Sequence, residues 1–241
     1  MQYNSFYVKI ILFRDKITSE IKYLYKKKDP NERPMVLDVL LQAQQESIDD
    51  LSFRYGCRAR NCGVCTVDVN GKPRLACRAR VKENDVISPL ATLPVIKDLI
   101  VKRDNISRQL IGFNNISRKN NLNVEANKTY HNLTACIECY ACLDGCPLHK
   151  KNNLKNNDNN AYSFGNPFSF LKLHRLYVDP LTPEVEKKGI IEKAKVLGLD
   201  TYRREFNKLK IKCGVGIDLK NDVIKPLLAV AYGDQVEKKN K

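Results

Sequence analysis

The stretch Cys57–Cys77, CRARNCGVCTVDVNGKPRLAC, contains four of the nine cysteines of this 241-residue chain. Their spacing is C-x4-C-x2-C-x11-C, and its first intervals are those of a plant-type [2Fe-2S] loop, which takes its last thiolate from a following strand. Structural zinc is the competing interpretation, but zinc sites usually pair two short C-x2-C hooks. The longer first interval and small residues such as Gly63 favour a cluster that carries sulfides. The spacing therefore predicts a [2Fe-2S] cluster bound by Cys57, Cys62, Cys65 and Cys77.

A second group of four cysteines lies in CIECYACLDGCP, Cys136 to Pro147, with the spacing C-x2-C-x2-C-x3-C-P. This is the run of bacterial ferredoxins, whose fourth cysteine ligates the other cluster in two-cluster proteins. Three thiolates this close together can reach three irons of one cubane, and the proline is expected to turn the chain so that Cys146 points elsewhere. The run predicts a [4Fe-4S] cluster bound by Cys136, Cys139 and Cys142, with one further ligand.

The cysteine count and the apolar pattern indicate a reducing compartment. An odd total of nine cysteines argues against a complete set of disulfides. The N-terminus, MQYNSFYVKIILFRDK, has a short apolar run typical of a strand and lacks the pattern of a signal peptide. No run approaches the roughly 18 apolar residues that would span a bilayer. We therefore expect a cytoplasmic protein with no membrane span, in which clustered thiols bind metal.

The formal net charge of +15 raises the question of nucleic acid binding. Lysine and arginine are spread along the chain and do not form one basic face interleaved with aromatic residues. A solvated basic surface is therefore the favoured interpretation, and we expect no nucleic acid partner. If the charge has a role, it suits docking to an acidic partner or to an anionic membrane face.

The first half of the chain has the pattern of a mixed α and β unit. Alternation in FYVKIILF and SEIKYLY predicts an N-terminal hairpin, and PMVLDVLLQAQQE predicts a helix that begins after a proline. Asn70-Gly71 predicts a tight turn between two strands after the cysteine loop. The unit is therefore expected to run strand, strand, helix, cysteine loop and strand pair.

The second half is expected to be mostly helical. Helical spacing of apolar residues occurs in FSFLKLHRLYVD, PEVEKKGIIEKAKVLGL and DVIKPLLAVAY, whereas the polar runs at 114–132 and 149–163 suggest surface loops. We predict an α+β protein with two domains, at residues 1–104 and 105–241.

These motifs together resemble the iron–sulfur subunit of succinate dehydrogenases and fumarate reductases. Beyond the two cysteine groups, the resemblance rests on LPVIKDLIVKRD, GNPFSFLKLHRLYVDP, LGLDTYRREF and CGVGIDLKNDVIKPL, and it extends from about residue 6 to about residue 233. It implies an N-terminal β-grasp plant-type ferredoxin domain followed by a helical bacterial-ferredoxin-like domain. It also implies an FAD-containing flavoprotein partner, a membrane-anchor or thiol-oxidising partner, and a part in the tricarboxylic acid cycle.

Two departures from the resembled pattern bear on the clusters. Arg60 and Val64 replace small residues of the first loop, which changes the surroundings of that cluster without removing a ligand. Before Cys213 the sequence reads YRREFNKLKIKCGVG, as though three cysteines of a second run were missing. Crossed ligation then predicts Cys213 as the fourth ligand of the [4Fe-4S] cluster, with Cys146 left as the orphaned ligand of a lost third cluster. The alternatives are that Cys213 is a core residue and that Cys146 is the fourth ligand.

No catalytic acid, nucleophile or phosphate loop is evident, and the isolated His131, His149 and His174 suit surface or packing positions. The expected function is electron relay within an oxidoreductase, with no catalytic site of its own. The chain has no tryptophan, whereas the resembled quinone pocket includes one, which puts delivery to quinone in doubt. The alternatives are a thiol-driven fumarate reductase of the methanogen type and a stand-alone ferredoxin-like carrier. As part of a complex, the chain could lie peripherally on the cytoplasmic face of a membrane.

Overall fold

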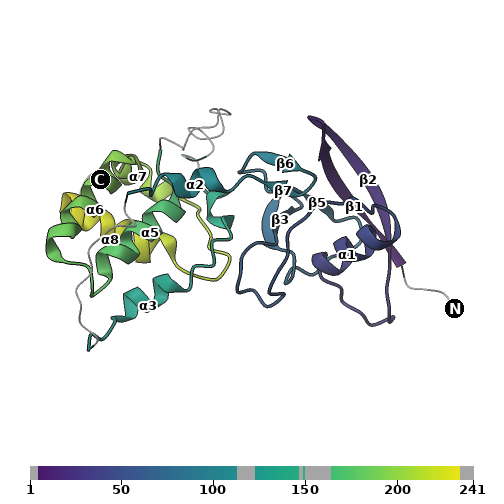
Figure 1. Cartoon of the computed structure of the whole chain (residues 1–241), viewed down its shortest axis with the longest axis horizontal. Coiled ribbons are helices and arrows are strands. Elements are labelled where there is room, and N and C mark those ends of the chain that lie inside the picture. The colour runs from purple at the N-terminus through teal and green to yellow at the C-terminus, as the bar shows by residue number, and fades with distance from the viewer. Residues whose placement is uncertain (1–4, 113–122, 147–148, 150–163, 234–241) are drawn as a thin grey trace. The chain divides into compact units, whose positions relative to one another are not determined.

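The computed structural model describes residues 5–112, 123–146, 149 and 164–233 (Figure 1). The chain divides into two compact units. Unit 1 comprises Met1–Lys102 and the short segment Ile137–Ala141, and unit 2 comprises Arg103–Cys136 and Cys142–Lys241. The boundary predicted after residue 104 falls two residues beyond the break at Lys102. The inclusion of Ile137–Ala141 in unit 1 is a feature that the sequence did not indicate.

Unit 1 is built on a five-stranded sheet with the strand order β2-β1-β5-β3-β4. The central pair β1·β5 is parallel, and the pairs β1·β2, β3·β4 and β3·β5 are antiparallel. This order around a parallel centre, with one helix packed on the sheet, is the β-grasp arrangement that the resemblance implies. A separate two-stranded ribbon, β6·β7, follows. The strands are β1 Ser5–Arg14, β2 Ile17–Lys26, β3 Thr66–Val69, β4 Lys72–Leu75, β5 Val86–Ser88, β6 Val95–Lys97 and β7 Ile100–Val101.

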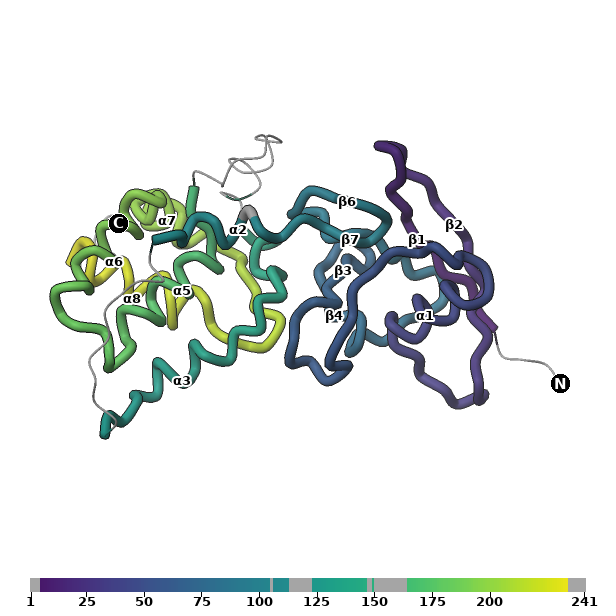
Figure 2. Tube along the Cα trace, viewed as in Figure 1, coloured from purple at the N-terminus to yellow at the C-terminus, as the bar shows by residue number. Residues whose placement is uncertain are grey.

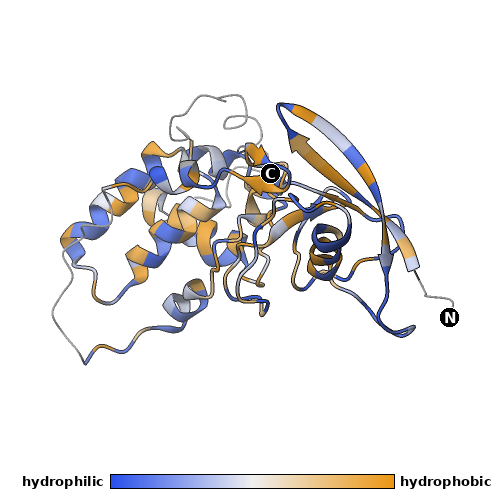
Figure 3. Cartoon of the chain, turned by 45° about the vertical axis from the view of Figure 1, so that its right-hand side comes forward, coloured by the Kyte–Doolittle hydropathy of each residue, from blue (hydrophilic) through white to orange (hydrophobic). Residues whose placement is uncertain are grey.

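The predicted hairpins and helix of this unit are confirmed. Hydrophobic residues recur along the β1·β2 hairpin (Figure 3), and the alternate residues Val8, Ile10 and Leu12 of β1 are buried. The helix α1, Val36–Glu46, lays its apolar stripe on the same core. It begins one residue later than the proline suggested, because Met35 is the N-cap and its N–H donates to the Asp38 carboxylate at 2.8 Å.

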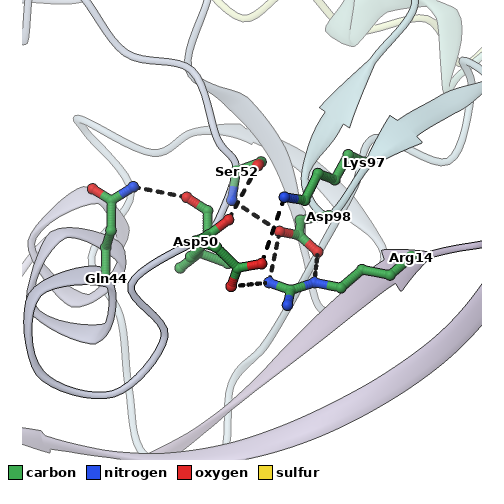
Figure 4. Close-up of polar contacts among 7 residues, drawn as sticks. Arg14, Gln44, Asp50, Ser52, Lys97 and Asp98 are labelled. Carbon is green, nitrogen blue, oxygen red and sulfur yellow. Dashed lines mark hydrogen bonds and ion pairs between the residues drawn. The ribbon is translucent and has the colours of Figure 1, made fainter.

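A buried carboxylate joins the first strand to the chain that leads into the cysteine loop (Figure 4). Asp98 is fully buried; it accepts hydrogen bonds from Nε and Nη2 of Arg14 at 2.8 and 3.1 Å and from the backbone N–H of Ser52 at 2.9 Å. Asp50 bonds the same guanidinium at 2.8 Å, and Lys97 at 3.5 Å, but its side chain is half exposed. Hydrogen bonds to a buried charge stabilise far more than exposed ion pairs do.

Replacing Asp98 by Asn should therefore destabilise unit 1 by about 2 kcal/mol, because the amide offers one acceptor oxygen and no charge to Arg14 and Ser52. Urea unfolding of the purified chain measures the change. Asp50→Asn is the matched control and should cost less than about 0.5 kcal/mol. If the two variants lose the same free energy of unfolding, burial of the Asp98 carboxylate does not contribute to stability.

Unit 2 is helical, as the sequence predicts, and its core is formed mainly by α5, α6 and α8 with the turns between them. The Asn166 side chain caps α5 by accepting the Ser169 N–H at 3.1 Å. A π-helix, η4, precedes α8 and packs on α5. The described helices are α2 Asp104–Arg108, α3 Lys128–Thr134, α5 Pro167–Val178, α6 Glu184–Val196, α7 Leu199–Arg204, η3 Phe206–Lys208, η4 Leu219–Ile224 and α8 Lys225–Tyr232; η2, Ala141–Leu143, spans the break between the units.

His174 on α5 is buried in unit 2, and its Nδ1 has no hydrogen-bond partner among the described residues. Burial lowers the pKa of His174 from 6.5 to about 4, against a smaller opposing effect of the Asp222 backbone. Between pH 6.5 and 4, the His174 imidazole is therefore protonated in the unfolded chain but remains neutral in the folded chain. Stability that is fully present above pH 6.5 is lost as the pH falls through this window.

We expect this one group to remove on the order of 3 kcal/mol from unit 2 between pH 6.5 and 4. Urea titrations followed by far-ultraviolet circular dichroism, at several pH values, measure the loss. His174→Leu cannot titrate, so its stability should fall less steeply over the same window. Parallel curves for the two proteins would contradict the assignment.

Among the described residues, no helix is both long enough and apolar enough to cross a membrane. Most of the polar runs predicted as surface loops, residues 114–122 and 150–163, lie outside the described residues, as does Pro147. The loop prediction is wrong for residues 128–132, which belong to α3.

Candidate iron–sulfur sites

The first cysteine loop connects α1 to β3 and has no helix or strand between residues 47 and 65 (Figure 2). Arg58 and Arg60 adopt the left-handed backbone conformation, with φ of 54° and 60°. These turns wrap the backbone around one sulfur, so that the Cys57 Sγ accepts N–H groups from Ala59, Asn61 and Cys62 at 3.4, 3.2 and 3.3 Å. A cradle of backbone donors of this kind stabilises a negative charge.

The cradle changes the acidity of the thiol that it surrounds. The hydrogen bond from Ala59, followed by that from Asn61, lowers the pKa of Cys57 to about 7. The thiolate is the form that ligates metal. Cys57 is also exposed, so this predicted ligand lies at the surface of unit 1. The loop therefore fits the ligand role predicted for its first cysteine.

The β3·β4 hairpin brings the two buried cysteines together. Cys65 immediately precedes β3 and Cys77 follows β4, and the ladder between them ends in a bond from the Ala76 N–H to the Cys65 carbonyl at 3.0 Å. The predicted turn is confirmed, since Asn70 and Gly71 have φ of 52° and 71°. Burial raises the pKa of Cys65 to about 11, and the neighbouring Cys77 and Cys62 also raise it.

All four cysteines predicted for the [2Fe-2S] cluster are thus neighbours within unit 1. They form an outer pair, Cys57 with Cys62, and a buried pair, Cys65 with Cys77. A [2Fe-2S] cluster divides its thiolates between two irons. Among the described residues, no group of three or more His, Cys, Asp and Glu side chains is gathered closely enough for a single metal ion.

The second cysteine group is divided between the two cores. Cys136, Cys142 and Cys213 are half-buried and pack against the core of unit 2, and Cys213 Sγ accepts the Val215 N–H at 3.4 Å. Cys139 is 7% exposed and belongs to the core of unit 1, with Ile137 and Ala141 packed against the same core. Because Cys139 follows Cys136 and precedes Cys142 by only a few residues, the chain limits each Cα–Cα distance to about 11 Å. Their joint ligation of one cluster remains a prediction.

Cys146, which the sequence predicts to be the orphaned ligand of a lost third cluster, is fully buried in unit 2. Its sulfur lies 2.9 Å from the Tyr202 hydroxyl and accepts the His149 N–H at 3.4 Å. The Tyr202 hydroxyl donates to the Gly165 carbonyl at 3.3 Å. Burial raises the pKa of Tyr202 well above its ordinary value, so the phenol stays protonated. Sequence reasoning missed Tyr202, because nothing in LGLDTYRREF marks a tyrosine as the partner of a cysteine more than fifty residues earlier.

The three histidines lie at both surface and buried positions. His131 is exposed on α3, whereas His149 and His174 are buried in unit 2. None belongs to a preformed metal site among the described residues.

The sequence of the chain is similar to one known domain family and to several known proteins. Residues 8–108 match the family described as 2Fe-2S iron-sulfur cluster binding domain. An uncharacterized iron–sulfur protein of Methanocaldococcus jannaschii is 37% identical over 145 residues, which is 56% of this chain and 29% of that protein. One of the subunits of the CoM/CoB fumarate reductase of Methanothermobacter marburgensis is 31% identical over 166 residues, which is 67% of this chain and 32% of that protein.

A plant protein and a solved structure extend the comparison. Mitochondrial succinate dehydrogenase iron–sulfur subunit 3 of Arabidopsis thaliana is 32% identical over 129 residues, 48% of this chain and 42% of that protein. The chain thus spans less than half the length of these curated relatives. A chain of the Mycobacterium smegmatis Sdh1 complex in the apo form has the same fold, with a TM-score of 0.80 at 20% identity over 99% of this chain and 100% of that one. By sequence, the chain is therefore similar to subunits of a fumarate reductase and of a succinate dehydrogenase, the latter an iron–sulfur subunit; by fold it is similar to a chain of an Sdh complex, and its residues 8–108 match the family of 2Fe-2S cluster binding domains.

Proposed function

We propose that the chain is the iron–sulfur electron-transfer subunit of a succinate dehydrogenase or fumarate reductase type complex. It relays single electrons between an FAD-containing flavoprotein and a quinone or another redox partner. The observation that carries the proposal is the Cys57 cradle, with its three backbone donors, inside a domain that matches the 2Fe-2S family. A cluster held there supplies one-electron chemistry.

The residues around the first site have separate parts in this proposal. The backbone donors of Ala59, Asn61 and Cys62 stabilise negative charge at the exposed side. Cys65 and Cys77 hold the other side within the core and away from water. One ligand pair therefore faces a partner while the other is fixed by the sheet.

For the second site we propose a [4Fe-4S] cluster ligated by Cys136, Cys139, Cys142 and Cys213, with no third cluster. The ferredoxin spacing of the first three cysteines supports the cluster. Cys213 packs against the same core as Cys136 and Cys142, and this supports its role as the fourth ligand. The hydrogen bond between Cys146 and Tyr202 supports the loss of the third cluster, because the thiol that would serve it is bound to a phenol inside the core.

The nature of the second redox partner distinguishes two forms of the proposal. The relative from Methanothermobacter marburgensis is named for a CoM/CoB fumarate reductase, and it favours a thiol-oxidising partner. The plant relative is named for a ubiquinone-linked succinate dehydrogenase and favours a membrane-anchor partner and a place in the tricarboxylic acid cycle. Either complex would be cytoplasmic, or peripheral on the cytoplasmic face of a membrane.

Purification of the tagged chain from its native cells tests the proposal. We expect a flavoprotein to co-elute and the complex to reduce fumarate with a reduced dye. Oxidation of succinate with ubiquinone reduction would identify the quinone-linked form, and thiol-dependent fumarate reduction the other. A monomeric, iron-containing chain with no flavoprotein would instead establish the stand-alone carrier.

A further inference from the structure

Gly63 lies in the first ligand loop, between Cys62 and Cys65, and is buried. Its φ is +64°, a conformation that L side chains rarely adopt. Its carbonyl accepts the Thr66 hydroxyl at 3.0 Å. The position of this residue is therefore fixed from within unit 1.

The backbone of Ile137–Cys139 packs directly onto the open face of Gly63. A Cβ built on Gly63 would overlap the Ile137 carbonyl oxygen and lie 3.0 Å from the Cys139 nitrogen. Both neighbours are backbone atoms, so no side chain could rotate away to make room. Gly71 has nearly the same φ, +71°, but a Cβ there would meet nothing within 4 Å. The turn at Gly71 therefore requires glycine only for its positive φ. Gly63 is required both for its positive φ and because there is no room for a Cβ.

The segment that contacts Gly63 has a backbone that depends on its docking. Glu138 and Tyr140, on either side of Cys139, have φ of 55° and 58°. Left-handed conformations at non-glycine residues cost free energy and persist only when surrounding contacts hold them. Here the contacts come from unit 1, where Cys139 and Tyr140 are buried and Ile137 packs on the core.

We propose that Gly63 is a positioning residue for the second iron–sulfur site: the space it leaves in the first ligand loop seats the backbone of Ile137–Cys139 and so fixes the Cys139 thiol. The inference rests on the proposed [4Fe-4S] ligation by Cys139. It means that the loop between two ligands of one cluster also sets the place of a ligand of the other.

The test uses the full-length chain, reconstituted with iron and sulfide without oxygen, and reads iron content and the electron paramagnetic resonance of each cluster. Wild-type protein should hold about six irons. Gly63→Ala should keep the [2Fe-2S] signal and fall towards two irons, because the added Cβ displaces Cys139. Gly71→Ala is the matched control, because Gly71 also has a positive φ but an added Cβ there would contact nothing. This variant should keep about six irons.

The outcomes separate this inference from the function on which it rests. Wild-type protein that never exceeds two irons overturns the second cluster, and the role of Gly63 with it, before any variant is made. Six irons in Gly63→Ala, or equal losses in Gly63→Ala and Gly71→Ala, overturn the positioning role alone. If Gly63→Ala loses both clusters, Cys62→Ser decides, since it removes a first-site ligand without adding an atom at residue 63. Retention of the [4Fe-4S] signal in Cys62→Ser supports the role of Gly63, and its loss overturns it.

Discussion

Cys213→Ser should abolish the [4Fe-4S] signal as completely as Cys139→Ser, whereas Cys146→Ser should leave it nearly intact. The first two changes each remove a proposed thiolate from the same cubane, and each should lower the iron content from about six to about two per chain. Cys146 instead packs in the core of unit 2 and bonds the Tyr202 hydroxyl. Serine at that position retains a hydrogen bond to the phenol and removes no ligand.

Iron analysis and electron paramagnetic resonance of the reconstituted variants measure these effects. Wild-type protein serves as the reference, and Cys57→Ser, a first-site variant, should affect the [2Fe-2S] signal alone. Nine or ten irons per chain, or a [3Fe-4S] resonance, would contradict the assignment and indicate a third cluster. A large loss in Cys146→Ser with none in Cys213→Ser would establish Cys146 as the fourth ligand.

The second large effect concerns the N-terminal part alone. A fragment of residues 1 to about 105 contains every strand of the sheet, helix α1 and the four first-site cysteines. It should fold, bind about two irons and show the red-brown visible absorption of a plant-type ferredoxin. The fragment lacks Ile137–Ala141, but that segment supplies no ligand to the first site.

Replacing both Cys65 and Cys77 by Ser in the fragment is the control and should give a colourless protein, because the buried ligand pair is lost. Absorption spectra and metal analysis provide the measurement. A colourless wild-type fragment with one bound zinc would show that the cysteine spacing was misinterpreted.

Much of the fold follows from local sequence. The Asn70-Gly71 turn was predictable because both positions need positive φ, and α5 and α6 were predictable from apolar spacing. The three-residue strand β5 was not, because its pairing with β1 joins residues far apart in the chain. The π-helix η4 was also missed, since apolar spacing does not distinguish its hydrogen bonds from those of an α-helix.

The candidate sites were likewise predictable only in part from the sequence. Spacing indicated the closely spaced cysteines of each predicted site, because the plant-type loop and the bacterial ferredoxin run each have short, fixed intervals. Cys213 was inferred instead from the resemblance and from crossed ligation. It did not indicate that Cys146 bonds Tyr202, or that Gly63 receives the backbone of Ile137–Cys139. Those contacts form by tertiary packing between segments that are far apart in the sequence. The residue types of one segment do not indicate which other segment will contact it.

The membership of Ile137–Ala141 in unit 1 has a consequence for the order of events during synthesis. The sheet, α1 and the first ligand loop are all complete in the chain by about residue 102, but the last piece of unit 1 is not made until residue 141. At about 5–20 residues per second, a ribosome takes a few seconds to cover that interval. The strands and the first ligand loop are therefore synthesised before the segment that packs on Gly63. Under the proposed ligation, the second centre cannot be complete until Cys213 has also been made.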